Sequence, residues 1–124
     1  MAVMQSRDNR TFEAGSDLSA GQFKFLALAS DGQVDVNTTL GGKSIGVLLN
    51  NPSAVGYAAT VCLSGSVLVK CASTIAAGAQ VASTATGLAA LTATGQIILG
   101  YALEAGVVNQ IIEIEFITGG NAAA

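Results

Sequence analysis

Residues 110–117 read Gln-Ile-Ile-Glu-Ile-Glu-Phe-Ile, and most of this stretch alternates between apolar and charged side chains. Successive side chains of a β-strand point to opposite faces, so the stretch separates its carboxylates from its apolar groups. One face carries Glu113 and Glu115, and the other carries Ile112, Ile114 and Phe116. We expect a strand with one face toward solvent and the other toward a core.

Upstream of this strand, residues 18–119 consist of short apolar runs broken by Gly, Asn, Asp and Ser, which is typical of many short strands with tight turns. The adjacent pair Asp31 and Gly32 is a strong hairpin signal. Residues 72–90 are rich in Ala, but Gly, Thr and Ser make them a poor helix. We predict an all-β fold, a small β-barrel or β-sandwich, with strands over residues 24–30, 33–37, 45–49, 58–63, 67–72, 97–103 and 110–117 and shorter ones near 81 and 88–91.

The chain also repeats itself. Glycines with similar neighbours recur at an offset of about 55 residues and in the same order along the chain, as Gly21 and Gly78, Gly32 and Gly87, Gly46 and Gly100, and Gly65 and Gly119. Two copies of a four-strand unit would form a compact structure with pseudo-symmetry, because one copy is too short to bury a core alone. The alternative is coincidence, since short periodic patterns are easily matched in any β protein punctuated by glycine.

Residues 1–17 differ from the rest of the chain. They hold five of the thirteen charged residues and only isolated apolar side chains, with no period of a strand or a helix. We predict an extended N-terminal arm over residues 1–17, either disordered alone or ordered by a partner, a β domain over residues 18–119, and a flexible tail over residues 120–124.

Composition excludes several classes of protein. A net charge of −3 with five scattered cations argues against nucleic-acid binding. The most apolar stretch, residues 97–105, is far too short to span a membrane, and no signal peptide begins the chain, so we expect synthesis and use without secretion. Charged residues make up 10% of the chain against about 25% in ordinary soluble proteins, so part of the apolar surface is expected to be covered by other chains.

Enzymatic chemistry is not expected. The chain has no His, which removes the usual general base and the usual zinc ligands. Cys62 and Cys71 flank an expected hairpin, so a disulfide is conceivable, although buried free thiols fit a reducing cytosol better. Lys70 raises the alternative of a biotinyl or lipoyl carrier domain, but it lies within an expected strand, away from the hairpin tip that such a lysine occupies. We predict no catalytic, cofactor or metal site.

The chain resembles the capsid decoration (cement) proteins of tailed bacteriophages. The most specific matching segments are Gly-Val-Leu-Leu-Asn-Asn-Pro at residues 46–52 and Gly-Tyr-Ala-Leu-Glu-Ala-Gly at residues 100–106, and weaker ones are residues 19–22, 59–61 and 112–116. The resemblance implies a virion protein on the exterior of the capsid, made in the host cytoplasm, that assembles as a homotrimer and contacts the major capsid protein. It also implies that an N-terminal arm helps to clamp the shell.

By position, residues 2–17 are the candidate arm. We hypothesise that its apolar side chains dock into grooves of the shell while its arginines pair with capsid carboxylates. The residues concerned are Val3, Met4, Phe12, Arg7 and Arg10. The principal alternative to a decoration protein is a structural module of a phage fibre, tail or surface layer.

Overall fold

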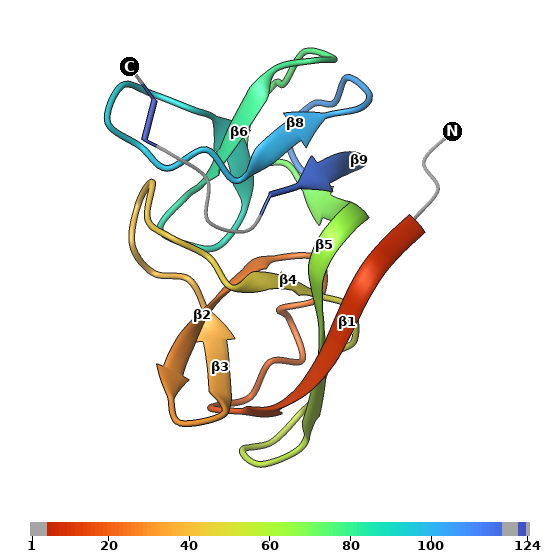
Figure 1. The fold of residues 1–124 in the computed structure, drawn as a ribbon, viewed down its shortest axis with the longest axis vertical. Coiled ribbons are helices and arrows are strands. Elements are labelled where there is room, and N and C mark those ends of the chain that lie inside the picture. Colours follow the sequence, from red (N-terminus) through yellow and green to blue (C-terminus); the bar gives the residue numbers. More distant parts are fainter. Residues whose placement is uncertain (1–4, 118–121, 124) are drawn as a thin grey trace.

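A computed structural model describes residues 5–117, 122 and 123, with side chains from residue 8 onward. Within these residues every regular element is a strand, which confirms the all-β prediction (Figure 1). The strands are β1 (Gln5–Ala14), β2 (Phe25–Ser30), β3 (Gln33–Val36), β4 (Gly46–Leu48), β5 (Ala58–Lys70), β6 (Gln80–Ser83), β7 (Ala89–Leu91), β8 (Gly100–Ala102) and β9 (Ile111–Phe116).

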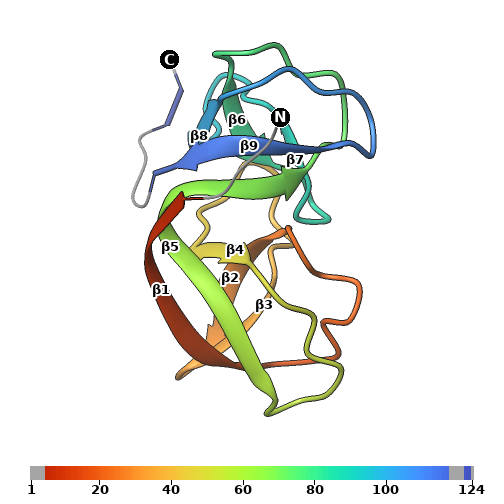
Figure 2. The ribbon, with the colours of Figure 1, turned by 90° about the vertical axis from the view of Figure 1, so that its right-hand side faces the viewer.

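The strands form one sheet in the order β1-β3-β2-β4-β5-β9-β8-β6-β7. An additional antiparallel pairing between β1 and β5 closes the first five strands into a ring. In the second half of the chain, a parallel bridge between Cys71 and Ala89 brings the end of β5 back to β7 in the same way. Figures 1 and 2 show the result as two lobes joined through the long strand β5.

The order of the strands is the same in both lobes. Strands β3-β2-β4-β5 of the first lobe correspond to β7-β6-β8-β9 of the second, and β1 corresponds to the second half of β5. We call β1–β4 with residues 58–64 the N-terminal unit, and residues 65–70 with β6–β9 the C-terminal unit. The predicted duplication is confirmed, but each unit has five strands, because β5 ends one unit and begins the next.

Backbone hydrogen bonds recur at equivalent positions of the two units. The amide of Ala14 donates to the carbonyl of Tyr57 at 2.8 Å, and the amide of Cys71 donates to the carbonyl of Gln110 at 2.8 Å. The two donors, Ala14 and Cys71, are 57 residues apart in the sequence (71 − 14), and the two acceptors, Tyr57 and Gln110, are 53 residues apart (110 − 57). The equivalence therefore extends beyond the glycines from which the repeat was predicted.

One of the four predicted glycine correspondences is displaced. The amide of Phe23 donates to Leu48 at 2.8 Å, and the amide of Gly78 donates to Ala102 at 2.7 Å. Phe23 and Gly78 both have positive φ, of 65° and 83°. Gly78 is therefore the counterpart of Phe23 and not of Gly21. The two units share a backbone conformation with positive φ at this position, which glycine adopts freely.

Strand β5 runs without interruption through Ser64, Gly65 and Ser66, where the sequence predicts a turn between two strands. Gly65 has a φ of 101°, so it bends the strand without reversing it. At this bend Gly65 is paired on both sides, with Ser6 of β1 on one side and with Phe116 of β9 on the other. The hairpin prediction is wrong because pairing on both edges holds the chain extended where its local sequence favours a turn.

The described part of the predicted arm belongs to the sheet. From Gln5 to Glu13, β1 pairs antiparallel with β5, and its end pairs in parallel with β3. A boundary between arm and domain at residue 18 therefore does not exist in the described chain, and residues 1–4 lie outside it. Of the predicted tail over residues 120–124, the structure describes Ala122 and Ala123. The carbonyl of Ala123 accepts a hydrogen bond from the amide of Gly95 at 3.0 Å, and its amide donates to the carbonyl of Gln96 at 2.8 Å.

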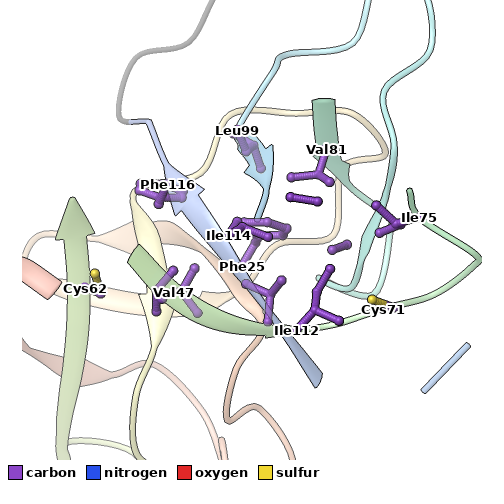
Figure 3. Packing of buried hydrophobic residues seen from close by; sticks show 14 residues of the cluster. Phe25, Val47, Cys62, Cys71, Ile75, Val81, Leu99, Ile112, Ile114 and Phe116 are labelled. Atoms are coloured by element: carbon purple, nitrogen blue, oxygen red, sulfur yellow. The ribbon is translucent and has the colours of Figure 1, made fainter. Parts of the chain in front are cut away.

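Two clusters of buried side chains stabilise the fold. The smaller fills the N-terminal unit and includes Phe12, Leu26 and Leu48. The larger fills the C-terminal unit and also takes in the outward-pointing side chains of the N-terminal unit's sheet (Figure 3). The rings of Phe25 and Phe116, one from each unit, lie 6.2 Å apart between centroids. The second core is therefore also the interface between the units.

Candidate interaction surfaces

The described residues contain no group of three His, Cys, Asp or Glu side chains placed to hold a metal ion. In the same residues no helix has the length and hydropathy needed to cross a membrane. Cys62 and Cys71 are both buried free thiols, as predicted. Burial raises the pKa of both thiols, which disfavours the thiolate that a nucleophile requires.

The candidate carrier lysine, Lys70, is the last residue of β5 and lies partly buried on the face of the sheet. It pairs in register with Ile111, the first residue of β9. The loop that follows it is folded back, since the amide of Ala72 donates to Ala89 at 2.7 Å. Lys70 is thus a side chain on a sheet face, whereas a carrier lysine is presented at a hairpin tip.

Of the five residues predicted to bind a capsid, the structure describes the side chains of two, Arg10 and Phe12. Val3 and Met4 lie outside the described chain, and Arg7 lies on β1 with a side chain that the structure does not describe. Phe12 is 6% exposed and belongs to the core of the N-terminal unit. Phe12 is therefore not available to a shell groove while β1 remains in the sheet.

Arg10 is exposed, and its guanidinium carbon lies 4.8 Å from the centre of the Phe12 ring. A cation over an aromatic ring at an exposed site is stabilised by about 0.5–1 kcal/mol. Arg10 therefore covers the buried ring while leaving its charge in solvent. Of the predicted side chains that the structure describes, it is the one that could meet a carboxylate of another chain.

Exposed apolar side chains concentrate in the C-terminal unit. Five of the ten large exposed hydrophobic residues come from residues 101–111, each between 40% and 57% exposed. They are Tyr101, Leu103, Val107, Val108 and Ile111. The sequence pattern predicted which face of residues 110–117 is outward, and that prediction is confirmed, since Ile112, Ile114 and Phe116 are buried.

The register of the strands places three of these residues, Tyr101, Leu103 and Ile111, on one face. Lys70 lies opposite Ile111, Leu68 opposite Glu113, and Ser66 opposite Glu115. Tyr101 of β8 lies opposite Glu115 on the other side of β9 and opposite Gln80 of β6. We call this outer face of β5, β9, β8 and β6 the C-terminal face; its residues are Ser66, Leu68, Lys70, Gln80, Tyr101, Leu103, Ile111, Glu113 and Glu115.

In the N-terminal unit the corresponding outer face is covered. There the row Phe25, Val47 and Cys62 corresponds to Gln80, Tyr101 and Glu115, because the strand pairings have the same order and register. All three side chains of the first row are fully buried against the C-terminal unit. The same face of the fold is thus a contact between units in one half and is open in the other.

An acidic depression lies beside β2 and β3, on the N-terminal unit. The hydroxyl of Ser16 donates to Asp35, and the carboxylate of Asp17 accepts a hydrogen bond from the amide of Ser19 at 2.9 Å. That backbone hydrogen bond lowers the pKa of Asp17. The carboxylate of Asp17 is engaged within its own loop and that of Asp35 by the hydroxyl of Ser16, and the two of them are too few to bind a hard cation.

The C-terminal face was not predicted from the sequence. The sequence contained part of the information, because residues two apart on a strand share a face. This spacing puts Ile111 on the same face as Glu113 and Glu115, and Leu103 on the same face as Tyr101. What the sequence lacked was the register between β8 and β9, which sets these side chains on one surface.

Comparison with known proteins places the fold. No protein-family model matches the chain, and no curated protein sequence matches it. Among solved structures, the chain is similar to the N base of the head fibre protein gp8.5 of bacteriophage phi29, with a TM-score of 0.69. The similarity covers 89% of this chain and 93% of that one at 16% sequence identity, so it shows a shared fold.

Proposed function

We propose that the protein is a structural component of a phage virion that binds the outer surface of the head and stabilises the expanded capsid as a decoration protein. It is made in the host cytoplasm, contacts the major capsid protein, assembles as a homotrimer and catalyses no reaction. The observation that carries the proposal, as far as a structural protein of a phage head, is the fold, shared over nearly the whole chain with the base of a phage head fibre.

Two features of the chain support this role. The segments at residues 46–52 and 100–106 that resemble decoration proteins are equivalent parts of the two units, each running from a central strand into the loop that follows it. The described surface also carries ten exposed large hydrophobic side chains, which suit a protein that works covered by other chains. Weak contacts suffice for such a protein, because display of several copies on a lattice raises their effective concentration.

The second candidate is the base module of a head fibre, and the fold shared with the base of the phi29 head fibre favours it directly. Both candidates bind the exterior of a head. They differ in the number of copies bound to each capsid, since a decoration protein occupies sites throughout the lattice and a fibre base occupies only the sites where fibres attach.

Co-sedimentation of the purified protein with expanded capsids stripped of it tests the proposal. Saturation at a stoichiometry that matches the lattice, with greater resistance of the capsid to heat, is expected for a decoration protein. Saturation at a small number of sites would select the fibre base. Absence of binding to any expanded capsid would contradict both.

The role of the arginines is tested with Arg10→Glu, alone and together with Arg7→Glu. If they pair with capsid carboxylates, reversal of charge lowers the affinity and flattens its dependence on salt. The matched control is Lys43→Glu, an exposed cation in the β3–β4 loop. Deletion of residues 2–17 is a poor test, because it removes β1 and Phe12 from the fold.

A further inference from the structure

We propose that Ala122 and Ala123 form a strap that caps the C-terminal unit, by making with backbone groups alone the contacts that a following unit would make. The strap pairs with the loop between β7 and β8, residues 92–99 (Figure 1). Capped in this way, the backbone of that loop is not free to pair with another chain. The inference concerns the chain alone and is independent of any binding to a capsid.

The loop that the strap contacts has an equivalent between β3 and β4 of the N-terminal unit. Gly41 and Gly95 occupy the same position of the two loops, with positive φ of 66° and 85°. In each loop the residue after this glycine donates its amide hydrogen to the carbonyl three residues earlier, at 3.0 Å in both cases. Each glycine also lies the same number of residues before the next strand, which begins at Gly46 in one unit and at Gly100 in the other. The two loops therefore present equivalent backbone groups.

In the N-terminal unit these backbone groups are bonded to the second half of the chain. The amide of Gly41 donates to the carbonyl of Ser83, the last residue of β6, at 2.8 Å. The carbonyl of Gly41 accepts a hydrogen bond from the amide of Ile97 at 2.9 Å. Both the donor and the acceptor of Gly41 are therefore used in the contact between the two units.

In the C-terminal unit the strap takes the place of these partners. The amide of Gly95 donates to the carbonyl of Ala123 at 3.0 Å, as the amide of Gly41 does to that of Ser83. The amide of Ala123 donates to the carbonyl of Gln96 at 2.8 Å. One residue of the strap thus supplies an acceptor and a donor to a loop that has no following unit in the described chain.

The strap replaces the backbone contacts of a following unit but not the contacts of its side chains. A Cβ built on Gly41 would lie 2.3 Å from Cγ of Gln96, so the second half of the chain packs closely against this glycine. A Cβ built on Gly95 would meet no atom of the described residues within 4 Å. The space beside Gly95 is therefore open where its counterpart is filled.

Thr92 shows the same difference. The amide of Asn37 donates to the carbonyl of Phe25 at 2.9 Å. The amide of Thr92 donates to the counterpart of Phe25, Gln80, at 3.1 Å, so Thr92 has the position of Asn37. The side-chain amide of Asn37 donates to the hydroxyl of Ser83 across the units, whereas the buried hydroxyl oxygen of Thr92 has no partner among the described residues. The C-terminal unit thus keeps the contact position of a following unit, and the strap covers the backbone part of it.

A cap of this kind has a physical purpose. Unpaired N–H and C=O groups at the margin of a β fold are a template for pairing with other chains. The outermost units of repeated folds accordingly need a cap to remain in solution. Without the strap, Gly95 and Gln96 would present a free donor and a free acceptor side by side.

The first test is hydrogen exchange on the full chain and on a variant that lacks residues 122–124. The amide of Gly95 should exchange about tenfold faster or more in the variant, because its acceptor on Ala123 is gone. The amide of Gly41 is the internal control. It is bonded to Ser83 and should exchange at the same rate in both proteins.

The second test is sedimentation velocity over a hundredfold range of concentration. We expect the average mass of the variant without residues 122–124 to rise with concentration above that of the unaltered protein. Ala123→Pro should do the same, because proline has no N–H to donate to Gln96. Ala123→Ser keeps this N–H and should behave as the unaltered protein. Circular dichroism establishes that each variant is folded, and Ala123→Pro carries the test if the deletion variant is not.

The inference is overturned if Gly95 exchanges at the same rate with and without residues 122–124. It is also overturned if the folded variants keep the mass of the unaltered protein at every concentration, or if Ala123→Ser associates as strongly as Ala123→Pro. The proposed function is judged separately, since co-sedimentation with capsids uses the unaltered chain.

Discussion

Asn50 and Glu104 make the same contact in the two halves of the chain with different chemical groups. The amide oxygen of Asn50 accepts a hydrogen bond from the backbone N–H of Thr60 at 3.0 Å. The carboxylate of Glu104 accepts one from the backbone N–H of Glu113 at 3.1 Å. Each side chain follows the central strand of its unit and fixes the start of the unit's last strand.

The equivalence of Asn50 and Glu104 predicts the effect of substituting Glu104. Glu104→Gln should leave the free energy of unfolding nearly unchanged, because at Asn50 an amide oxygen accepts the equivalent hydrogen bond. Glu104→Ala should lower the free energy of unfolding by about 1–2 kcal/mol, since it leaves the N–H of Glu113 without its acceptor. Urea unfolding measures both, and equal losses for the two variants would mean that the hydrogen bond is not what stabilises the loop.

Gly100 should not tolerate a side chain. A Cβ built there would lie 2.2 Å from the carbonyl oxygen of Glu115, a backbone atom that cannot turn away. We expect Gly100→Ala to cost about 3 kcal/mol or more, at or beyond the usual range for overpacking. The matched control is Gly15→Ala, where the nearest atom belongs to the carboxylate of Asp35, which can move. A Gly100→Ala protein as stable as the control would contradict the close approach of these strands.

The two units are also joined by a buried polar contact. The side-chain amide of Asn37 donates to the hydroxyl of Ser83 at 2.8 Å, and both residues are almost fully buried. Ser83→Ala should destabilise the protein by about 1–3 kcal/mol, because a buried donor of Asn37 loses its acceptor. Ser30→Ala removes an exposed hydrogen bond to Gln33 and should change stability by less than about 0.5 kcal/mol.

Phe12 should prove to be a core residue. Its burial among the side chains of the N-terminal unit predicts that Phe12→Ala lowers the free energy of unfolding by about 3–5 kcal/mol. Arg10→Ala, which removes only the cation over the ring, should cost about 1 kcal/mol or less. A Phe12→Ala variant with full stability and impaired capsid binding would restore the view of this residue as an arm contact.

The thiols should make stability fall at alkaline pH. Burial raises the pKa of Cys62 and Cys71 in the folded protein, so the folded state holds these protons more tightly than the unfolded state. Their contribution is complete below the usual thiol pKa of about 8.5 and is lost as the pH rises above it. Unfolding curves from pH 7 to 10 should show this loss, and a Cys62→Ala, Cys71→Ala double variant should show less of it.

Much of the architecture could be predicted from local sequence. Gly32 and Gly87 both adopt positive φ, of 70° and 77°, in turns that the sequence marked. The alternation over residues 110–117 correctly separated Glu113 and Glu115 from the core side chains. Such patterns are predictable because the period of a strand and the freedom of glycine act within a few residues.

The sequence did not predict the pairing of β1 or the continuity of β5. From residue 8 onward, where the structure describes the side chains of β1, the strand places only Phe12 and Ala14 in the core. It is held by backbone hydrogen bonds to β5, which any side chain permits. Gly65, in a Ser-Gly-Ser stretch typical of turns, bends within a strand because partners on both edges extend it. Pairing between distant segments therefore leaves little trace in local composition.

By itself, then, the sequence determined that the chain is all-β and repeated, and which way the side chains of its last strand point. The tertiary structure alone decided that β5 serves two units, and that Phe25, Val47 and Cys62 lie in an interface while Tyr101 remains open. The reason is that alternation assigns a side chain to a face of its strand, whereas burial of that face depends on what the rest of the chain packs against it.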